Sequence, residues 1–163
     1  MKKVVAITSA MVLFLCLAGL AFAKADDFVG TWKMNPGQSK FATGHATEDE
    51  VRMIVNSDKG LRVSVRRVNE NGATREYEYT SNLDGKAYPI TGDAPYGADM
   101  IVADLASPNT IQVTLKKGNQ VVATATAVVS HDGKELTVTT KGTDTNGNHF
   151  TNVLVYQKER VRK

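Results

Sequence analysis

The chain has 163 residues, which fits one domain of ordinary size and leaves little room for a second. Its formal net charge is +3, but Lys2 and Lys3 belong to an N-terminal export segment, and removing those two from 20 leaves 18 basic residues against 17 acidic ones. A nearly neutral domain gives no reason to expect nucleic acid or an anionic membrane as a partner.

The first 23 residues have the three-part layout of a secretory signal peptide. Two lysines open the segment, the uncharged run 4–20 follows, and Ala21-Phe22-Ala23 places small residues at the two positions that a signal peptidase reads. We therefore expect cleavage before Lys24 and a periplasmic or secreted domain of residues 24–163, with no membrane anchor left. The alternative is an uncleaved anchor, because about 20 apolar residues can just cross a bilayer.

The only cysteine, Cys16, lies inside this apolar run. The bulky residues Phe14 and Leu15 precede it, whereas a lipoprotein signal has small residues there, so lipidation is not expected. Cleavage removes Cys16 and leaves no thiol for a disulfide, a nucleophile or a metal site.

Residues 24–163 alternate strand-like runs with turn signals, and no stretch has the period of a long amphipathic helix. In chain order, the predicted strands are residues 28–34, 51–53, 61–66, 74–79, 111–116, 121–129, 136–140 and 150–156. The run 121–129 is almost entirely Val, Ala and Thr. Such a run is typical of a strand covered on both faces, or of a small-residue strand in a tight barrel.

The connections carry hairpin signals such as Asn71-Gly72, Asp84-Gly85 and Asn146-Gly147. Two stretches, 35–49 and 91–99, are predicted as longer loops. Successive hairpins give an antiparallel up-and-down meander of eight to ten strands, and closing it into a barrel removes its exposed edges. We predict an all-β antiparallel barrel, with a two-sheet sandwich as the alternative.

The first predicted strand contains Gly30-Thr31-Trp32, which resembles the opening G-x-W motif of the lipocalins and their calycin relatives. The resemblance implies a lipocalin-like barrel in which Trp32 plugs the closed end and a basic residue near the last strand packs across its ring. Lys158 and Arg160 follow the last predicted strand, and we assign this barrel-closing contact to Gly30, Trp32 and Arg160.

The chain also resembles a group of small, uncharacterised, exported bacterial proteins with lipocalin-like barrels. The segments that carry the resemblance, residues 30–36, 88–92, 132–142 and 152–156, are spread over nearly all of the mature chain. This group implies a fold and no activity. The fatty-acid-binding relatives hold a carboxylate with an Arg-x-Tyr on the last strand, and the last predicted strand here has no such pair.

Aromatic and basic side chains are the candidates for ligand contact. Tyr77 and Tyr79 project from one face of their strand, Tyr88 lies just before the second loop, and Arg66 shares the polar face of its strand with Arg62. If that polar face points inward, the arginines could hold an anionic ligand. The alternative, which we favour, has both arginines facing water while the apolar residues of the same strand fill the core. The predicted ligand-binding residues are Tyr77, Tyr79, Tyr88 and Arg66.

No catalytic or metal-binding arrangement is apparent. Ser130-His131-Asp132 has the residue types of a serine triad, but triad members normally come from distant positions, and with Gly133 the string predicts a polar turn. His45, His131 and His149 have no partner at metal-ligand spacing. We predict no enzyme, no cofactor and no metal.

Together these features predict an exported lipocalin-like protein that binds a small, largely apolar molecule in its interior. The alternative is an envelope or secreted protein-interaction module with a filled core and no ligand.

Overall fold

The computed structural model describes residues 25–42, 47–144 and 146–160. The predicted signal peptide, its cleavage site, Cys16 and His45 lie outside these residues. Within the described part of the chain, no helix has the length and apolar character that a membrane span requires.

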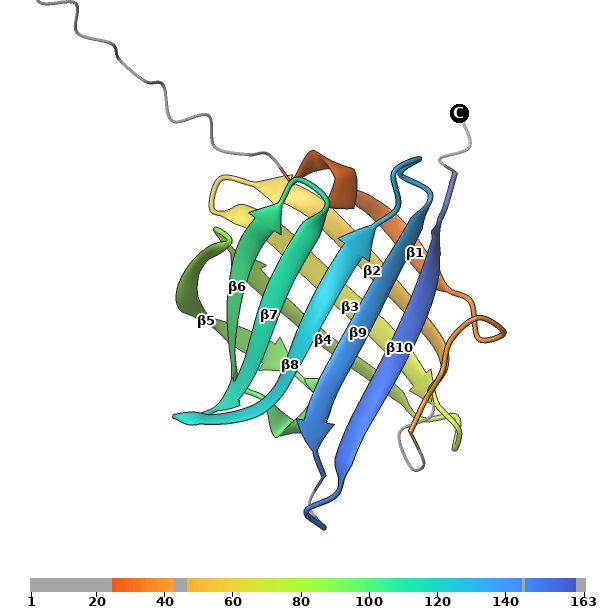
Figure 1. Ribbon diagram of the computed structural model, residues 1–163, viewed down its shortest axis with the longest axis vertical. Coiled ribbons are helices and arrows are strands. Elements are labelled where there is room, and N and C mark those ends of the chain that lie inside the picture. Colours follow the sequence, from red (N-terminus) through yellow and green to blue (C-terminus); the bar gives the residue numbers. More distant parts are fainter. Residues whose placement is uncertain (1–24, 43–46, 145, 161–163) are drawn as a thin grey trace, which may run out of the picture.

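Within the described ranges, ten strands form one closed antiparallel barrel (Figure 1). The strands are β1 (Gly30–Met34), β2 (Thr47–Ser57), β3 (Gly60–Asn69), β4 (Thr74–Ser81), β5 (Asp84–Gly92), β6 (Met100–Ser107), β7 (Thr110–Lys117), β8 (Gln120–Val129), β9 (Glu135–Thr143) and β10 (His149–Lys158), with short 3-10 helices η1 (Asp26–Phe28) and η2 (Pro95–Gly97). Each strand pairs with its neighbours in sequence, and β1 closes the barrel against β10. The predicted up-and-down barrel is confirmed, and the sandwich alternative is wrong.

The two strands that the sequence did not predict are β5 and β6. β5 contains Pro89 and two glycines, and it pairs with β4 over only three residues, 77–79. The turn before it lies at Asn82 and Leu83, with Leu83 at φ 56°, rather than at the predicted Asp84-Gly85. The two predicted loops are also shorter than expected, because residues 47–49 already belong to β2 and residues 91–92 to β5.

Side chains alternate between the barrel interior and solvent, as the pleat of a strand requires. On β3, Leu61, Val63 and Val65 are buried while Arg62 and Arg66 are exposed. The structure therefore agrees with the favoured interpretation, in which both arginines face water and the apolar residues fill the core.

Of the two alternatives for the run 121–129, a strand covered on both faces or a small-residue strand of a barrel, β8 is the second. Ala123 is buried, and Ala125 and Ala127 pack against the core, whereas Val121 and Val128 on the other face remain 53% and 36% exposed. The outer face of β8 is thus uncovered, and its inner face is formed by small side chains.

Trp32 packs in the core beside η1, at one end of the barrel. Its side chain is fully buried, and its Nε1 donates a hydrogen bond to the Phe28 carbonyl oxygen at 2.7 Å. Lys158, its register partner on β10, places Nζ 4.9 Å from the centre of the ring. The cation over Trp32 is therefore Lys158 and not the predicted Arg160, which lies two residues farther on, past the end of β10, and is exposed.

Gly30 makes room for this contact. It adopts φ 148°, and a Cβ at this position would lie 2.5 Å from Cε of Lys158. A side chain here would displace the lysine from the tryptophan ring.

The two ends of the barrel differ. Because neighbouring strands are antiparallel, η1 and the β2–β3 and β6–β7 hairpins share one end with Trp32, here called the Trp32 end (Figure 1). The β3–β4, β7–β8 and β9–β10 hairpins lie at the opposite end with η2, here called the η2 end. Binding sites in barrels are reached from their ends.

Candidate functional site

The barrel encloses a cavity of about 320 Å³. Its wall extends from Phe28, near the Trp32 end, to Asn69 and Tyr96, near the η2 end, and most of it is aliphatic or aromatic. The volume lies at the lower end of the range typical of small-molecule sites, roughly 300–1,000 Å³.

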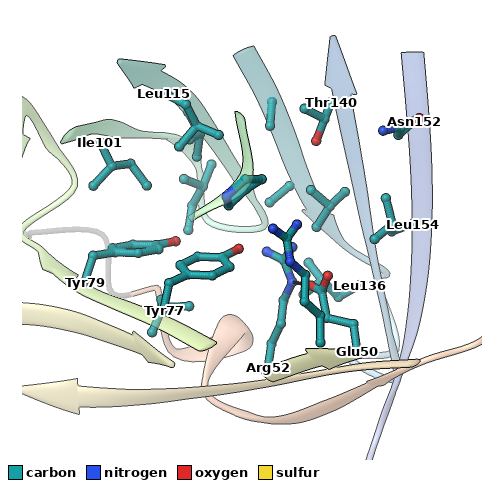
Figure 2. Close-up of a pocket in the computed structure, with 18 of the residues that line it drawn as sticks. Glu50, Arg52, Tyr77, Tyr79, Ile101, Leu115, Leu136, Thr140, Asn152 and Leu154 are labelled. Carbon is teal, nitrogen blue, oxygen red and sulfur yellow. Dashed lines mark hydrogen bonds and ion pairs between the residues drawn. The ribbon is translucent and has the colours of Figure 1, made fainter. Parts of the chain in front are cut away.

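Two of the predicted ligand-binding residues lie in this wall. Tyr77 and Tyr79 extend from β4 into the cavity, with Arg52 and Glu50 beside them and Ile101 on the facing side (Figure 2). Burial raises the pKa of both phenols. At neutral pH each hydroxyl therefore stays protonated and can donate a hydrogen bond.

The other two predicted residues lie elsewhere. Arg66 is on the outer face of β3, where its half-exposed side chain places Nε 3.6 Å from Oε1 of Glu76. Tyr88 pairs in register with Ile101 and is half-buried, and its hydroxyl donates to Oδ1 of Asp84 at 3.0 Å. Neither residue lines the cavity. Arg66 lies outside the cavity because β3 points its even-numbered side chains outward.

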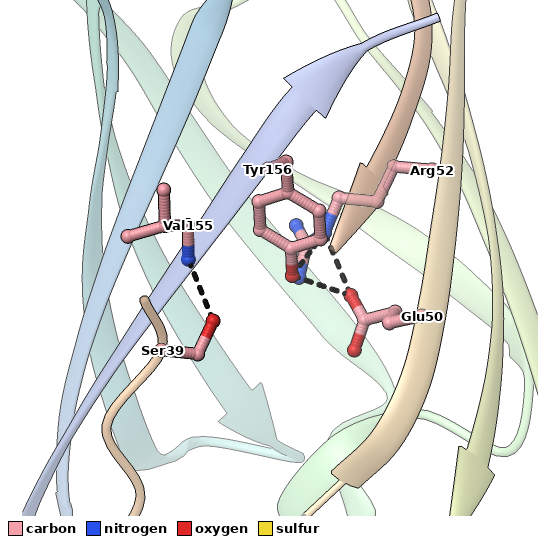
Figure 3. A network of polar contacts seen from close by, with 5 residues as sticks. All are labelled: Ser39, Glu50, Arg52, Val155 and Tyr156. Atoms are coloured by element: carbon pink, nitrogen blue, oxygen red, sulfur yellow. Dashed lines mark hydrogen bonds and ion pairs between the residues drawn. The ribbon is translucent and has the colours of Figure 1, made fainter. Parts of the chain in front are cut away.

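A buried polar network that the sequence did not predict joins β2 to β10 (Figure 3). Oε1 of Glu50 accepts hydrogen bonds from Nε of Arg52 at 2.8 Å and from the Tyr156 hydroxyl at 2.7 Å. The same Arg52 Nε lies 2.9 Å from the Tyr156 oxygen. Burial raises the pKa of Tyr156, which keeps its hydroxyl a donor. An arginine and a tyrosine thus meet here from two different strands, although no Arg-x-Tyr occurs on the last one.

The loop after β1 is held against β10 beside this network. Oγ of Ser39 accepts a hydrogen bond from the backbone N–H of Val155 at 3.0 Å (Figure 3), and Lys40 forms a bridge with Val153.

Two further arginines lie in the cavity wall. Arg67 on β3 and Arg75 on β4 line it close to the β3–β4 hairpin, at the η2 end. With Arg52 included, the charged residues that line the cavity are three arginines and one glutamate, Glu50. Simple alternation places both there: Arg67 continues the inward series of β3, and Arg75 shares the face of Tyr77.

Tyr96, which adopts φ 61° in η2, lines the cavity at its η2 end. Its ring stacks on Phe150 with centroids 4.9 Å apart, and its hydroxyl accepts a hydrogen bond from Nδ2 of Asn152 at 3.2 Å. The other end of Asn152, its Oδ1, accepts from the backbone N–H of Ala42 at 2.8 Å.

The triad-like string is a turn, as the sequence predicts. Oγ of Ser130 donates to Oδ1 of Asp132 at 2.7 Å, and the Gly133 N–H donates to the Ser130 carbonyl at 2.9 Å. Among the described residues, no group of three His, Cys, Asp or Glu side chains is placed to hold a metal ion.

Comparison with known proteins shows one similarity, and it is in the fold. No protein-family model matches the chain, and no curated protein matches it. A solved structure that is similar is that of zebrafish ileal bile acid-binding protein complexed with cholic acid, with a TM-score of 0.50 and 12% sequence identity. The similarity covers 82% of this chain and 99% of that one. The two proteins share the fold of a closed, all-β antiparallel barrel. At this identity the similarity shows the fold alone.

Proposed function

We propose that this protein is an exported binding protein, without enzymatic activity, that takes up a small, largely apolar molecule inside its barrel. The observation that carries the proposal is the internal cavity of about 320 Å³ with a mainly apolar wall. The zebrafish protein with a similar fold is complexed with cholic acid, which supports a small molecule as the ligand. Export is supported by the sequence of residues 1–23.

The cavity exists because part of the wall is made of small side chains. Ala103, Ala125 and Ala127 line it from β6 and β8, where larger residues would fill the interior. Interiors of proteins are normally packed to the density of organic crystals, and voids of this size are rare. A cavity kept open by alanines favours a ligand-binding barrel over a filled interaction module.

The neutral fluorescent probe N-phenyl-1-naphthylamine tests this proposal. It should bind the full chain at one saturable site. Ala125→Phe places a ring in the cavity and should weaken that binding at least tenfold, with the far-UV circular dichroism of the barrel retained. Thr124→Phe, the next residue on the same strand with its side chain exposed, is the matched control and should bind the probe as the wild type does. The proposal is wrong if the wild type binds no probe, or if both variants bind it equally well.

A further inference from the structure

Two arginines face each other directly on the inner wall. Arg67 on β3 and Arg75 on β4 are register partners, and both line the cavity. Like charges directly opposite each other in an antiparallel pair destabilise it, and placing charges at a partly dry wall adds a desolvation cost. The preceding inward residues of β3, Val63 and Val65, are apolar. The fold itself therefore does not require charge at these positions.

The surrounding side chains compensate these charges only in part. Arg75 has one weak ion pair, with Nη1 3.4 Å from Oδ2 of Asp93, and both side chains are at least half exposed. Among the described residues, no ion pair or side-chain hydrogen bond joins Arg67 to an acidic residue. Glu50 is its register partner on β2, but Oε1 of Glu50 already accepts hydrogen bonds from Arg52 and Tyr156. The wall thus carries net positive charge at the η2 end.

We infer that the ligand is an amphipathic anion whose oxyanion head group binds between Arg67 and Arg75, while its apolar body occupies the aliphatic part of the cavity. This inference rests on the proposed function above. Planar guanidinium groups donate paired hydrogen bonds that match the geometry of a carboxylate or a sulfonate. An anion at this point would relieve the repulsion between the two arginines.

The same contacts fix the orientation of the ligand. Arg67 and Arg75 lie next to the β3–β4 hairpin, so the head group is at the η2 end and the body points toward the Trp32 end. Arg52 lies deeper, and Glu50 already neutralises it. A head group there would have to displace a buried carboxylate, which leaves the Arg67–Arg75 pair as its site.

Two probes that differ in one group test the inference. 1-Anilinonaphthalene-8-sulfonate is N-phenyl-1-naphthylamine with a sulfonate added. We expect the full chain, expressed with its own N-terminal segment, to bind the sulfonate at least tenfold more tightly than the neutral probe. Raising the salt concentration should weaken binding of the sulfonate and not of the neutral probe.

Variants assign the effect to the pair. The double variant Arg67→Gln/Arg75→Gln should lose the preference for the sulfonate over the neutral probe, and its far-UV circular dichroism shows whether the barrel is intact. Arg66→Gln, adjacent in sequence but on the outer face, should keep the preference. If the double variant does not fold, Arg75→Gln alone, at a half-exposed position, should weaken sulfonate binding several-fold.

The outcomes separate the two proposals. Binding of the neutral probe without any preference for the sulfonate would overturn the anionic ligand and leave the proposed function standing. A preference that survives in the double variant would also overturn the assignment to Arg67 and Arg75. If neither probe binds at a saturable site, the proposed function fails, and the inference fails with it.

Discussion

Glu50, Arg52 and Tyr156 form the most buried charged group among the described residues. The Glu50 and Arg52 side chains are only 4% and 17% exposed, and one carboxylate oxygen receives both hydrogen bonds. Removing one partner of a buried pair leaves an uncompensated charge, whereas an exposed pair contributes little. The stabilising role of this cluster can therefore be measured against an exposed pair on the same barrel.

We expect Glu50→Gln to lower the free energy of unfolding by about 3 kcal/mol, because Arg52 would keep its charge without a buried counter-ion. The control is Glu78→Gln, which breaks the 2.8 Å ion pair with Arg62 on the outer surface, where both side chains are about half exposed. Its effect on the free energy of unfolding should be clearly smaller than that of Glu50→Gln. Urea unfolding of the full chain measures both, and equal losses would contradict the prediction.

The tyrosines predict how the barrel responds to alkaline pH. Burial raises the pKa of Tyr77, Tyr79, Tyr96 and Tyr156 above the ordinary value of about 10. Above pH about 10 the unfolded chain loses these protons while the folded barrel still holds them, so stability is present below that pH and falls as the pH rises.

We expect most of the tyrosinate absorbance to appear together with the loss of far-UV circular dichroism. Independent, reversible ionisation of all five tyrosines near pH 10 in a folded barrel would contradict this.

Some of these site residues follow from the sequence by period-two alternation. Tyr77 and Tyr79 are predictable in this way, and the same rule extends to Arg75 and Arg67. The Glu50–Arg52–Tyr156 cluster does not follow, because Arg52 and Tyr156 are 104 residues apart and meet only through the closure of the barrel. Arg66 was included among the predicted ligand-binding residues although alternation argued against it, since a polar strand face is normally the one that faces water.

At the scale of elements, the barrel closes where β1 pairs with β10, and this pairing is shorter than that of β1 with β2. Only three register pairs join the two strands, Trp32–Lys158 among them. Side-chain contacts between β1 and β10 therefore add to a short run of backbone pairing. The cation over Trp32 is one of these, and exposed cation–π contacts stabilise by about 0.5–1 kcal/mol.

We expect Lys158→Ala to lower the free energy of unfolding by about 0.5–1 kcal/mol and Arg160→Ala to leave it unchanged. Lys158 faces the tryptophan ring, whereas Arg160 is exposed beyond the strand. Urea unfolding distinguishes the two variants. A larger loss in Arg160→Ala would mean that Arg160, the residue assigned to this contact in the sequence analysis, stabilises the Trp32 end.

Strands β5 and β6 show why local sequence signals were insufficient for part of the barrel. Pro89 and the terminal glycines of β5 are poor strand formers, and its pairing with β4 is short. The strand forms because closing the barrel requires a neighbour for both β4 and β6. The eight strands that were predicted carry their own alternation and turns, which are local properties.

For the whole molecule, the meander was predictable because each hairpin is encoded within about a dozen residues. The cavity was not, because its volume depends on the sum of side chains contributed by eight strands. From the sequence alone, the alanines on β8 were as consistent with a tightly packed barrel as with one that contains a cavity. Only the closed fold shows that they leave space, with the charged residues gathered on one part of its wall.

Export of the protein can be tested at the predicted cleavage site before Lys24. Ala25 is only 7% exposed and Phe28 only 1%, so the chain joins the core immediately after the predicted cleavage site. Cleavage before Lys24 leaves this packing intact, whereas cleavage a few residues later would remove core side chains. Expressed in a bacterial host, the full chain should yield a soluble periplasmic product whose N-terminal residue is Lys24.

The matched variants are Ala23→Leu and Phe22→Leu. The first puts a bulky residue at a position that the peptidase reads and should leave a longer, membrane-retained chain, while the second changes an unread position and should be processed normally. N-terminal sequencing and intact mass of each cell fraction measure this. Full-length wild-type protein in the cytoplasm would refute export. A product beginning after Phe28 would instead show that the first helical turn is dispensable for the barrel.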